Sequence, residues 1–532
     1  MKPRKVLIVG GGSSGWMTAA YLNAALNRPG RQVAEISLVE SPDVPIIGVG
    51  EATIPSINHI LSVIGVDLIE FMKATDATFK QSIKFSNWLH NQGESYHHSF
   101  QRFREAPIDH TGADWFNSDR SIPFMETVSI QPKICEMNLS PMMMGPWDFG
   151  APLKYAFHMD ATKFAHFLQQ HSTARGVSHY LDHVDEVLVK DNGNIQAVKC
   201  QSGQVLEADL FIDCTGFAAL LIEKAMGVKF VDVSQWLLCD QALTMKIPYE
   251  HYYPGTVKPY TTATALSSGW IWDIGLQNRR AVGYVHASDF ISRDEAEAEL
   301  RTYEGDHSHD LDTRLVKFKV GYRERAWVGN CVAIGLSAGF IEPLESTGLY
   351  LSDLAAVMLR EYFPMSDDME QLAYRYNRII YNRFHEILDF INLHYCLTKR
   401  QDSEFWREVQ KSERITERLK AKLEFWQHKA PTDTDFEDQH FPTTPNSGAQ
   451  RPEGFSDIRQ PVDTGNIFPA TSYEAIMFGM DFMGDEMAQR HGNSRHHTQV
   501  HPNVARRLQA APSKLPPHDV WLKQILNMQH YN

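Results

Sequence analysis

Three glycines near the amino terminus have the spacing of a phosphate-binding turn. Gly10, Gly12 and Gly15 fit the pattern G-x-G-x-x-G in "KVLIVGGGSSGWMTAAYL", between an apolar run and a helix-forming run. The first glycine allows a tight bend, the second lets a pyrophosphate approach the backbone, and the third lets helix and strand pack closely. The start of the helix presents N–H groups to the phosphates. The spacing therefore predicts a dinucleotide site.

The next apolar run, "EISLVE", ends at Glu40, whose carboxylate can accept hydrogen bonds from a ribose diol. Two later segments also lead from a strand into a glycine-rich turn: "DLFIDCTGF" (209–217) and "WVGNCVAIGLSAGFIEPLESTGL" (327–349). They resemble the returning strands that flavoprotein monooxygenases place under FAD, which favours FAD over NAD. Because no separate NAD(P)H domain is evident, we expect the electrons to come from another protein.

Two tryptophans stand two residues apart in "GWIWDIGLQ" (269–277). The spacing of Trp270 and Trp272 places both indoles on one face of a strand. Such a face either belongs to the core or forms a wall around something reactive, and the two residues alone do not decide between these.

Composition narrows the class of protein. The chain has 532 residues, too many for one core, so we expect two or more lobes. Its 51 basic and 65 acidic residues give a net charge of −14, which argues against nucleic acid or an anionic membrane as the main partner. No run of 18 apolar residues occurs, and the apolar run of "MKPRKVLIVGGG" is too short for a signal peptide. Six scattered cysteines suit a reducing compartment, so we expect a cytoplasmic protein.

The predicted secondary structure of the chain changes near residue 350. Residues 1–350 alternate strand and helix patterns, with an insertion at about 91–154 that is rich in aromatic, Met and Pro residues. Residues 351–532 are mainly helical, and apolar residues at 3.6-residue spacing predict a helix over 366–396 with Ser366 as its N-cap. A second helix is expected over 403–428, followed by a long loop or lid at about 430–470.

Residues 491–501 contain four histidines, at 491, 496, 497 and 501. Their spacing is irregular and no acidic or cysteine partner is evident, so we expect solvated surface rather than a metal site.

Five segments together resemble the flavin-dependent tryptophan halogenases. They are "GGGSSGWMTAAYL" (10–22), "GVGEATIP" (48–55), "ATFKQSIKFSNW" (77–88), "GWIWDIG" (269–275) and "FIEPLESTGLY" (340–350). The resemblance covers most of residues 5–400. It implies an α/β fold like that of flavin monooxygenases, with a Rossmann-type βαβ unit plus mixed sheets in 1–350 and a helical, substrate-binding lobe in 351–532.

The resemblance also implies the activity. Enzymes of this family take FADH2 from a separate flavin reductase, form hypohalous acid at the flavin from bromide or chloride, and halogenate an electron-rich aromatic substrate. The family also leads us to expect a homodimer.

The family motifs select two catalytic side chains. Lys80, in "TFK", would hydrogen-bond the hypohalous acid or be halogenated as the free amine. From the residues alone Lys84 is an equal candidate. Glu345, in "EST", would orient the electrophile, stabilise the cationic ring and remove its proton. Glu342 is a competing carboxylate that the motif places outside this pair.

Further positions follow from the same resemblance. Thr347 and Gly348 match the halide site, where backbone N–H groups hold the anion. The residues expected to contact substrate are His98, Phe100, Trp270, Trp272 and Ser346. The residues expected to contact FAD are Gly10, Gly12, Ser13, Ser14, Gly15, Glu40, Ala52, Thr53, Val184, Gly335, Leu336 and Leu349. The tryptophans would keep the substrate away from the flavin.

Two departures from the family pattern concern the substrate. The tryptophan motif ends in Ile274-Gly275 where the family has Ile-Pro, which predicts a looser backbone. The Tyr-Tyr-Gly run and Glu that hold the charged end of free tryptophan are not found in 425–475. An apolar insert, "SPMMMGPWDFG", suits an adaptable pocket. We therefore expect an aromatic substrate without an amino-acid head, such as free indole or a larger indole or phenol.

Two alternatives stay open at this point. A flavin-dependent aromatic monooxygenase would share the fold and insert oxygen, although it would have no use for Lys80 and Glu345. A flavin-binding protein without turnover would act in binding or sensing.

Overall fold

The computed structural model divides the chain into two compact units, each assembled from three separated segments. Unit 1 comprises Met1–Ala77, Met159–Val233 and Lys319–Phe384, and unit 2 comprises Thr78–His158, Ser234–Phe318 and His385–Asn532. The residues that the structure describes are 2–44, 48, 50–103, 111–145, 149–440, 467–482, 484 and 496–526. The division into lobes at residue 350 stays a prediction.

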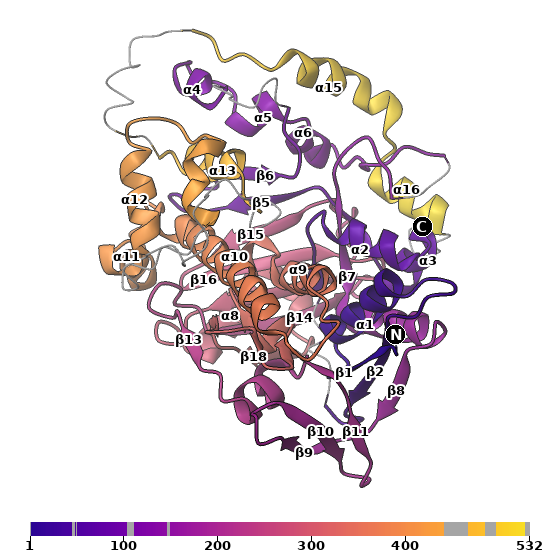
Figure 1. The fold of residues 1–532 in the computed structure, drawn as a ribbon. Helices are drawn as coiled ribbons and strands as arrows, with labels where there is room; N and C mark the ends of the chain where they lie inside the picture. Colours follow the sequence, from indigo (N-terminus) through magenta and orange to yellow (C-terminus); the bar gives the residue numbers. More distant parts are fainter. Residues whose placement is uncertain are drawn as a thin grey trace. The chain divides into compact units, whose positions relative to one another are not determined.

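A sheet of mostly parallel strands forms the centre of unit 1, with the order β20-β21-β12-β1-β2-β8 among the described residues (Figure 1). β1 (Arg4–Val9) pairs in parallel with β2 (Ala34–Glu40) and β12 (Leu210–Asp213). Its residues Val6–Val9 are all buried, as expected for a strand that is covered on both faces. The outer strands are β8 (Ser178–Leu181), β21 (Cys331–Ala333) and β20 (Trp327–Val328), of which only β20 pairs antiparallel.

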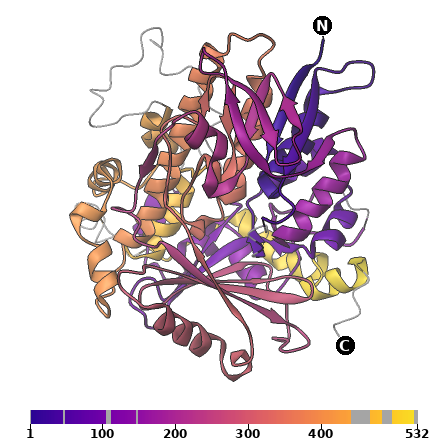
Figure 2. The same ribbon diagram turned by 90° about the horizontal axis from the view of Figure 1, so that it is seen from below.

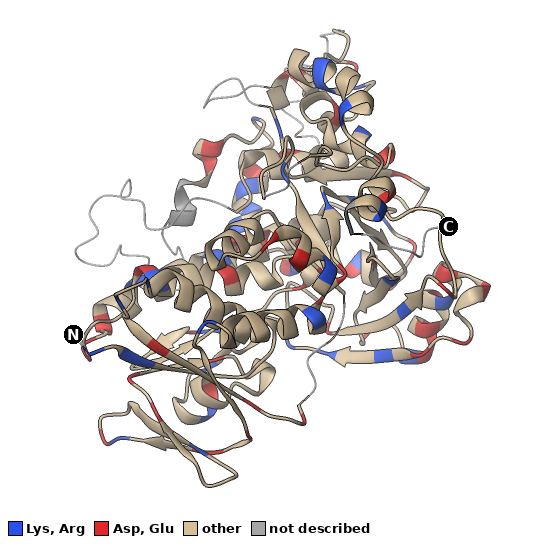
Figure 3. Cartoon of the chain, turned by 90° about the vertical axis from the view of Figure 1, so that its right-hand side faces the viewer, with Lys and Arg blue, Asp and Glu red and all other residues tan. Residues whose placement is uncertain are grey.

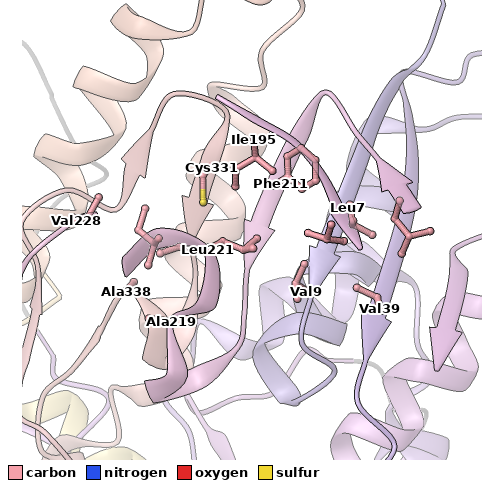
Figure 4. Close-up of a cluster of buried hydrophobic side chains, with 14 of the residues drawn as sticks. Leu7, Val9, Val39, Ile195, Phe211, Ala219, Leu221, Val228, Cys331 and Ala338 are labelled. Carbon is pink, nitrogen blue, oxygen red and sulfur yellow. The ribbon is translucent and has the colours of Figure 1, made fainter. Parts of the chain in front are cut away.

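The two faces of this sheet are covered differently. α1 (Ser13–Leu26) packs against α7 (Ala161–Thr173) and α9 (Gly348–Glu361). Leu7, Val9 and Phe211 belong to the apolar cluster of Figure 4, which Ile195 joins from a small antiparallel sheet. That sheet contains β9 (Val184–Val189), β10 (Ile195–Cys200) and β11 (Val205–Glu207). This arrangement confirms the predicted α/β fold with a Rossmann-type unit.

The remaining elements of unit 1 are short. The helices are α2 (Ile57–Ile64), α3 (Leu68–Thr75), η1 (Gly216–Ala218), η2 (Leu220–Ala225), η4 (Gly335–Ser337) and η5 (Pro343–Glu345). The strands are β3 (Gly50–Ala52), β13 (Phe230–Asp232), β19 (Gly321–Arg323) and β22 (Gly339–Phe340).

Unit 2 is built on a sheet with the order β18-β14-β17-β16-β15-β5-β6 among the described residues. Its strands between residues 241 and 317 are drawn in magenta to pink in Figure 2. The strands are β5 (Ser82–Ser86), β6 (Ser95–Ser99), β14 (Gln241–Pro248), β15 (Thr261–Ala265), β16 (Gly269–Gly275), β17 (Arg279–His286) and β18 (Thr313–Lys317). Its pairs are antiparallel except β15 with β5. α8 (Arg293–Glu304) packs on one face, where Leu300 joins a cluster with Ile271 and Tyr284.

Two further strands of unit 2 carry one of the candidate catalytic residues. β4 (Thr78–Lys80) pairs antiparallel with β7 (Ala156–Asp160), whose last two residues belong to unit 1. The insertion contributes the short helices α4 (Thr111–Phe116), α5 (Phe124–Val128) and α6 (Gln131–Glu136).

The later helices only partly match the predictions. α10 runs from Glu370 to Cys396, and it passes from unit 1 to unit 2 after Phe384. Ser366 lies before its start and is not its N-cap. The single helix expected over 403–428 is divided into α11 (Glu404–Val409), the turn η6 (Ser412–Arg414) and α12 (Glu417–Phe425). Ser403 caps α11 and Thr416 caps α12 with their hydroxyls, so the second piece begins at a cap of its own.

The chain then forms η7 (Asp433–His440), α13 (Ala470–Gly479), α15 (Pro502–Lys514) and α16 (His518–Leu526). Most of the loop predicted at 430–470 lies outside the described residues. Within the described part, no helix is long and apolar enough to cross a membrane. Figure 3 shows that basic and acidic residues are interspersed along both units.

One buried carboxylate organises the turn after β12. Asp213 is fully buried and accepts hydrogen bonds from the amides of Thr215, Leu221 and Ile222 at 2.8–2.9 Å and from the Thr215 hydroxyl at 2.7 Å. It therefore fixes the start of η2, which supplies part of the apolar cluster.

We predict that Asp213→Ala lowers the free energy of unfolding by about 2–4 kcal/mol, because several buried N–H groups lose their acceptor. Asp213→Asn should also destabilise, since an amide NH2 faces donors. Asp191→Asn, at an exposed turn position, serves as the control. Urea unfolding measures the effect, and equal stability of the Asp213 and Asp191 variants would contradict it.

Candidate active site

The glycine turn of unit 1 is shaped by close approaches of the backbone. Gly10 has a φ of +110°, and a Cβ there would collide with the Cys214 carbonyl. A Cβ on Gly15 would collide with the Gly10 carbonyl oxygen, whereas a Cβ on Gly12 would meet no atom within 4 Å. The turn therefore leaves space at Gly12, where the backbone is open to a ligand.

Glu40 lies at the end of β2 beside this turn. Its Oε1 is 2.8 Å from Nε2 of His179 on β8. Burial raises the pKa of the Glu40 carboxyl, and the charge of His179 acts in the opposite direction. A Cβ on Gly11 would overlap the Glu40 carboxylate. Sequence reasoning missed both Gly11 and His179. The GGG run was a visible signal for Gly11, while nothing in the sequence pointed to His179.

Two serines connect α1 to distant parts of unit 1. The Ser13 hydroxyl donates to the carbonyl of Ala161 at 3.2 Å, and Ser14 Oγ is 2.8 Å from Ser352 Oγ of α9. Gly335, with a φ of +78°, lies so close that its Cβ would be 2.6 Å from Ser14 Oγ. α1, η4 and α9 therefore meet at the glycine turn.

The other predicted FAD contacts are distributed around unit 1. Ala52 ends β3, and the buried Thr53 follows it. Val184 begins β9, Leu336 is half-buried in η4, and Leu349 is buried in the first turn of α9.

These features fit a dinucleotide. The turn gives a helix start with no side-chain cap, and the open space at Gly12 admits a pyrophosphate. The Glu40 carboxylate lies beside this turn in contact with His179.

The "PLESTG" segment contains buried carboxylates and a helix start. Glu345 ends η5 and is 2% exposed, and Glu342 is fully buried. Ser346 is held at a φ of +60° before Thr347, the residue preceding α9. The Thr347 hydroxyl is buried and has no hydrogen-bond partner among the described residues.

The start of α9 suits an anion. Its first turn contains no acidic residue, and a Cβ on Gly348 would meet nothing within 4 Å. The positive end of the helix dipole therefore faces open space. Further along α9, burial raises the pKa of Asp353 to about 7, against the opposing hydrogen bond from Ser56.

Lys80, at the end of β4 in unit 2, is completely buried. Its Nζ lies 5.2 Å from the centroid of the Phe100 ring, in the range of a cation–π contact. Lys84 differs: it is partly exposed and forms an ion pair with Glu136 at 2.8 Å. A buried amine is shielded from water, so Lys80 is better placed to donate a hydrogen bond to a reactant than Lys84, which a carboxylate holds near the surface. The predicted catalytic pair is thus divided, with Lys80 in unit 2 and Glu345 in unit 1.

His98 and Phe100 lie at and just beyond the end of β6. His98 Nε2 is 2.9 Å from Ser472 Oγ of α13, and its ring lies 5.6 Å from that of Phe390. Phe390 stacks on Phe468 at 3.8 Å. The structure therefore surrounds His98 with aromatic rings from α10 and from the segment before α13.

Trp270 and Trp272 share one face of β16, as predicted from their spacing. Their ring centroids are 6.3 Å apart, and Ile271 between them belongs to the cluster under α8 on the opposite face. Trp270 is buried, whereas Trp272 is half-buried and lies over Gly283 of β17, where a Cβ would overlap its ring. Sequence reasoning missed Gly283, which is found only once the register of β16 and β17 is known.

Gly275, the last residue of β16, has close neighbours on several sides. It pairs with Arg280 in the β16–β17 ladder, and its carbonyl accepts a hydrogen bond of 2.6 Å from the Thr78 hydroxyl. A Cβ at this position would lie 2.9 Å from Val257 Cγ1. The expected loosening of the backbone stays a prediction.

The carboxy-terminal histidines have separate partners. His497 lies 2.9 Å from Asp119, and His501 accepts the amide hydrogen of Asn503 at the start of α15. His491 lies outside the described residues. Within the described ranges, no group of three or more His, Cys, Asp or Glu side chains could hold a metal ion.

Comparisons with known proteins extend over nearly the whole chain. A family model described as tryptophan halogenase matches residues 5–494. Tryptophan 7-halogenase RebH of Lentzea aerocolonigenes is 37% identical over 440 residues, covering 79% of this chain and 81% of RebH. A tryptophan halogenase structure from Shewanella frigidimarina has 31% identity and a TM-score of 0.86, covering 99% of this chain and 98% of that one. BrvH, a flavin-dependent halogenase from Brevundimonas, has 29% identity and a TM-score of 0.80, covering 98% and 99%.

The contact between Trp272 and Gly283 gives a test of the tryptophan face. We predict that Gly283→Val costs about 1–3 kcal/mol of stability, because the added side chain must displace the indole. Trp272→Ala should remove most of this cost in the double variant. Thermal unfolding of the four proteins measures the coupling, and an equal cost of Gly283→Val in both backgrounds would contradict the assignment.

Proposed function

Because the chain belongs to the tryptophan halogenase family, we propose that it is an FADH2-dependent halogenase that modifies an electron-rich aromatic compound of the indole type. The observation that carries the proposal is Lys80, a completely buried lysine against the ring of Phe100. We expect the FADH2 to come from a separate flavin reductase and the halide to be bromide or chloride.

Unit 1 is proposed to generate the halogenating agent. The glycine turn and Glu40 would bind FAD, and the open start of α9 at Thr347 and Gly348 would bind the halide. When bound, reduced flavin supplies the oxidising chemistry that, with oxygen, converts halide to hypohalous acid. The chain's own contribution here is to hold an anion close to a helix terminus without a competing carboxylate in the first turn.

Lys80 is proposed to activate the hypohalous acid. Its ammonium would donate a hydrogen bond to the oxygen, which makes the halogen more electrophilic. The aromatic carbon then bonds to the halogen, the oxygen–halogen bond breaks, and the oxygen leaves as hydroxide. Glu345 is proposed to accept the ring proton, which finally joins the hydroxide to form water. The sum is an aromatic C–H plus hypohalous acid giving an aryl halide plus water.

The surroundings of His98 support a substrate without a charged head. Two residues beyond Phe100, Arg102 forms an ion pair with Glu474 of α13, and both side chains are buried. The Arg102 guanidinium also lies 5.5 Å from the ring of Phe124. A carboxylate already paired with an internal guanidinium is a poor partner for the ammonium of an amino acid. This supports indole, or a larger indole or phenol, as the substrate.

The role of Lys80 can be separated from that of a surface lysine. We predict that Lys80→Met reduces bromination of indole more than 100-fold, on the order of 3 kcal/mol of transition-state stabilisation, while FAD binding is retained. Lys84→Met, the matched control, should keep most of the activity. The assay is mass spectrometry of indole with FAD, a flavin reductase, NADH, air and bromide. Bromoindole formation by Lys80→Met at the wild-type rate would refute the assignment.

The buried ion pair gives a test of substrate class. We predict that Arg102→Gln raises kcat/KM for tryptamine relative to indole by about tenfold, roughly 1.4 kcal/mol, because Glu474 loses its internal partner and can bind the amine. Arg102→Gln with Glu474→Gln removes both charges and should show no such gain. If the single and double variants have the same tryptamine preference, the ion pair does not control the substrate.

A further inference from the structure

Two histidines far apart in the sequence are buried beside the strand that carries Lys80. His158 lies on β7, where it pairs with Thr78 of β4. His518 is the first residue of α16, about 440 positions after β4 in the chain. Both side chains are fully buried within unit 2, and neither belongs to a motif identified in the sequence.

His518 contacts β4 directly. The amide N–H of Phe79, the residue before Lys80, donates to His518 Nε2 at 3.3 Å. On the other side of the ring, Nδ1 lies 2.7 Å from the carbonyl oxygen of Val257. An amide N–H can only donate and a carbonyl can only accept, so Nδ1 carries the proton and Nε2 is bare. These partners therefore require a neutral imidazole in one tautomer.

The first turn of α16 is anchored on both sides of this ring. The His518 amide donates to the carbonyl of Asn138 at 2.8 Å, and the Asp519 carboxylate accepts the Val257 amide at 2.9 Å. One turn later, the Trp521 ring packs edge-on against Phe79 with centroids 4.7 Å apart. The helix therefore holds Phe79 by its backbone and by its ring.

Lys80 must point away from this contact. Successive residues of a strand face opposite sides, so Phe79 faces α16 while Lys80 faces the side on which Phe100 lies. His158 shares the face of Thr78 and Lys80, because directly paired residues of a ladder lie on the same side. Its Nε2 is 2.8 Å from Thr261 Oγ1.

Burial favours the neutral form of both histidines. Lys80 on β4, His158 on β7 and Asp519 on α16 are the titratable groups that act on this pair of histidines. Burial lowers the pKa of His518, while its bond to Val257 and the charge of Asp519 oppose the shift. Burial and the charge of Lys80 hold the pKa of His158 well below its usual value. His158 therefore adds no positive charge beside Lys80.

We propose that His518 is a positioning residue for Lys80: its neutral imidazole holds the Phe79 amide, fixes the end of β4 and so aims the lysine at the Phe100 side. The inference rests on the proposed function, in which Lys80 activates hypohalous acid. It assigns the carboxy-terminal helix α16 a part in catalysis, although no side chain of α16 is required to touch substrate. A small displacement of a reacting group is enough to lower a rate by about 100-fold.

Two substitutions of His518 test its two hydrogen bonds separately, because each can keep one bond and lose the other. His518→Gln can place an oxygen near the position of Nε2 and keep an acceptor for Phe79. His518→Asn can keep a donor for Val257 near the position of Nδ1 but lacks the acceptor. His501→Asn is the matched control, since His501 is the N-cap of α15, lies in the same part of the chain as His518 and also accepts a backbone amide hydrogen.

The experiment uses the full chain with FAD, a flavin reductase, NADH, air, bromide and indole. It measures bromoindole and, in parallel, hypobromous acid that escapes and brominates the small trap monochlorodimedone. We expect His518→Asn to lower kcat for bromoindole about 10- to 100-fold with an unchanged KM for indole, while escaped hypobromous acid rises. His518→Gln should restore most of the coupling, and His501→Asn should leave it intact.

Three results would overturn the proposal. If His518→Asn forms bromoindole without extra escape of hypobromous acid, His518 only stabilises the fold. The same follows if the loss of bromoindole formation in the Asn and Gln variants simply follows their melting temperatures. A wild-type enzyme that yields neither bromoindole nor hypobromous acid would overturn the proposed function and the positioning role with it. Wild-type activity with retained coupling in His518→Asn would overturn the positioning role alone.

Discussion

The burial of Lys80 is the constraint on which the proposed site in unit 2 depends. An ammonium removed from water loses its hydration, so its surroundings must compensate or the group is neutralised. The ring of Phe100 offers a negative aromatic face, and the imidazoles of His158 and His518 have partners or surroundings that favour their neutral forms. The Lys80 amine thus lies in a buried environment beside an aromatic ring. A hydrogen bond from it to an incoming electrophile is stronger there than in water.

The glycine turn of unit 1 is limited instead by steric contacts of the backbone. Gly10 and Gly15 are required because a Cβ would strike a neighbouring carbonyl, and Gly11 is required because a Cβ would strike Glu40. Only the Gly12 position is open. Three of the four glycines therefore pack the turn, and one leaves it accessible. The start of α9 shows the same openness at Gly348, so unit 1 offers two places where backbone groups can meet an anion.

Local patterns in the sequence predicted the parts of the fold that depend on local chemistry. The glycine spacing gave the strand–turn–helix of β1 and α1, the spacing of Trp270 and Trp272 gave their common face, and apolar periodicity gave the body of α10. The single helix expected over 403–428 is two helices, because the Thr416 hydroxyl caps a new helix start inside that range. Ser366 was a reasonable cap by type, but the helix begins four residues later.

The residues that sequence reasoning missed are defined by contacts across long stretches of chain. Gly283 matters because the register of two strands places it under Trp272. His179 matters because β8 lies next to β2, and His518 because α16 returns to β4. None of these pairings has a local signal. The roles of Lys80 and Glu345 came instead from family motifs, and burial then distinguished Lys80 from Lys84.

The most direct test of the central claim follows the oxygen and the halogen in one reaction. The wild-type protein is supplied with FADH2, indole and ¹⁸O2, with and without bromide, and the products are analysed by mass spectrometry. A halogenase gives bromoindole that carries no ¹⁸O when bromide is present, and no modified indole when bromide is absent. An indole product that carries ¹⁸O in both reactions would contradict the account and identify a monooxygenase.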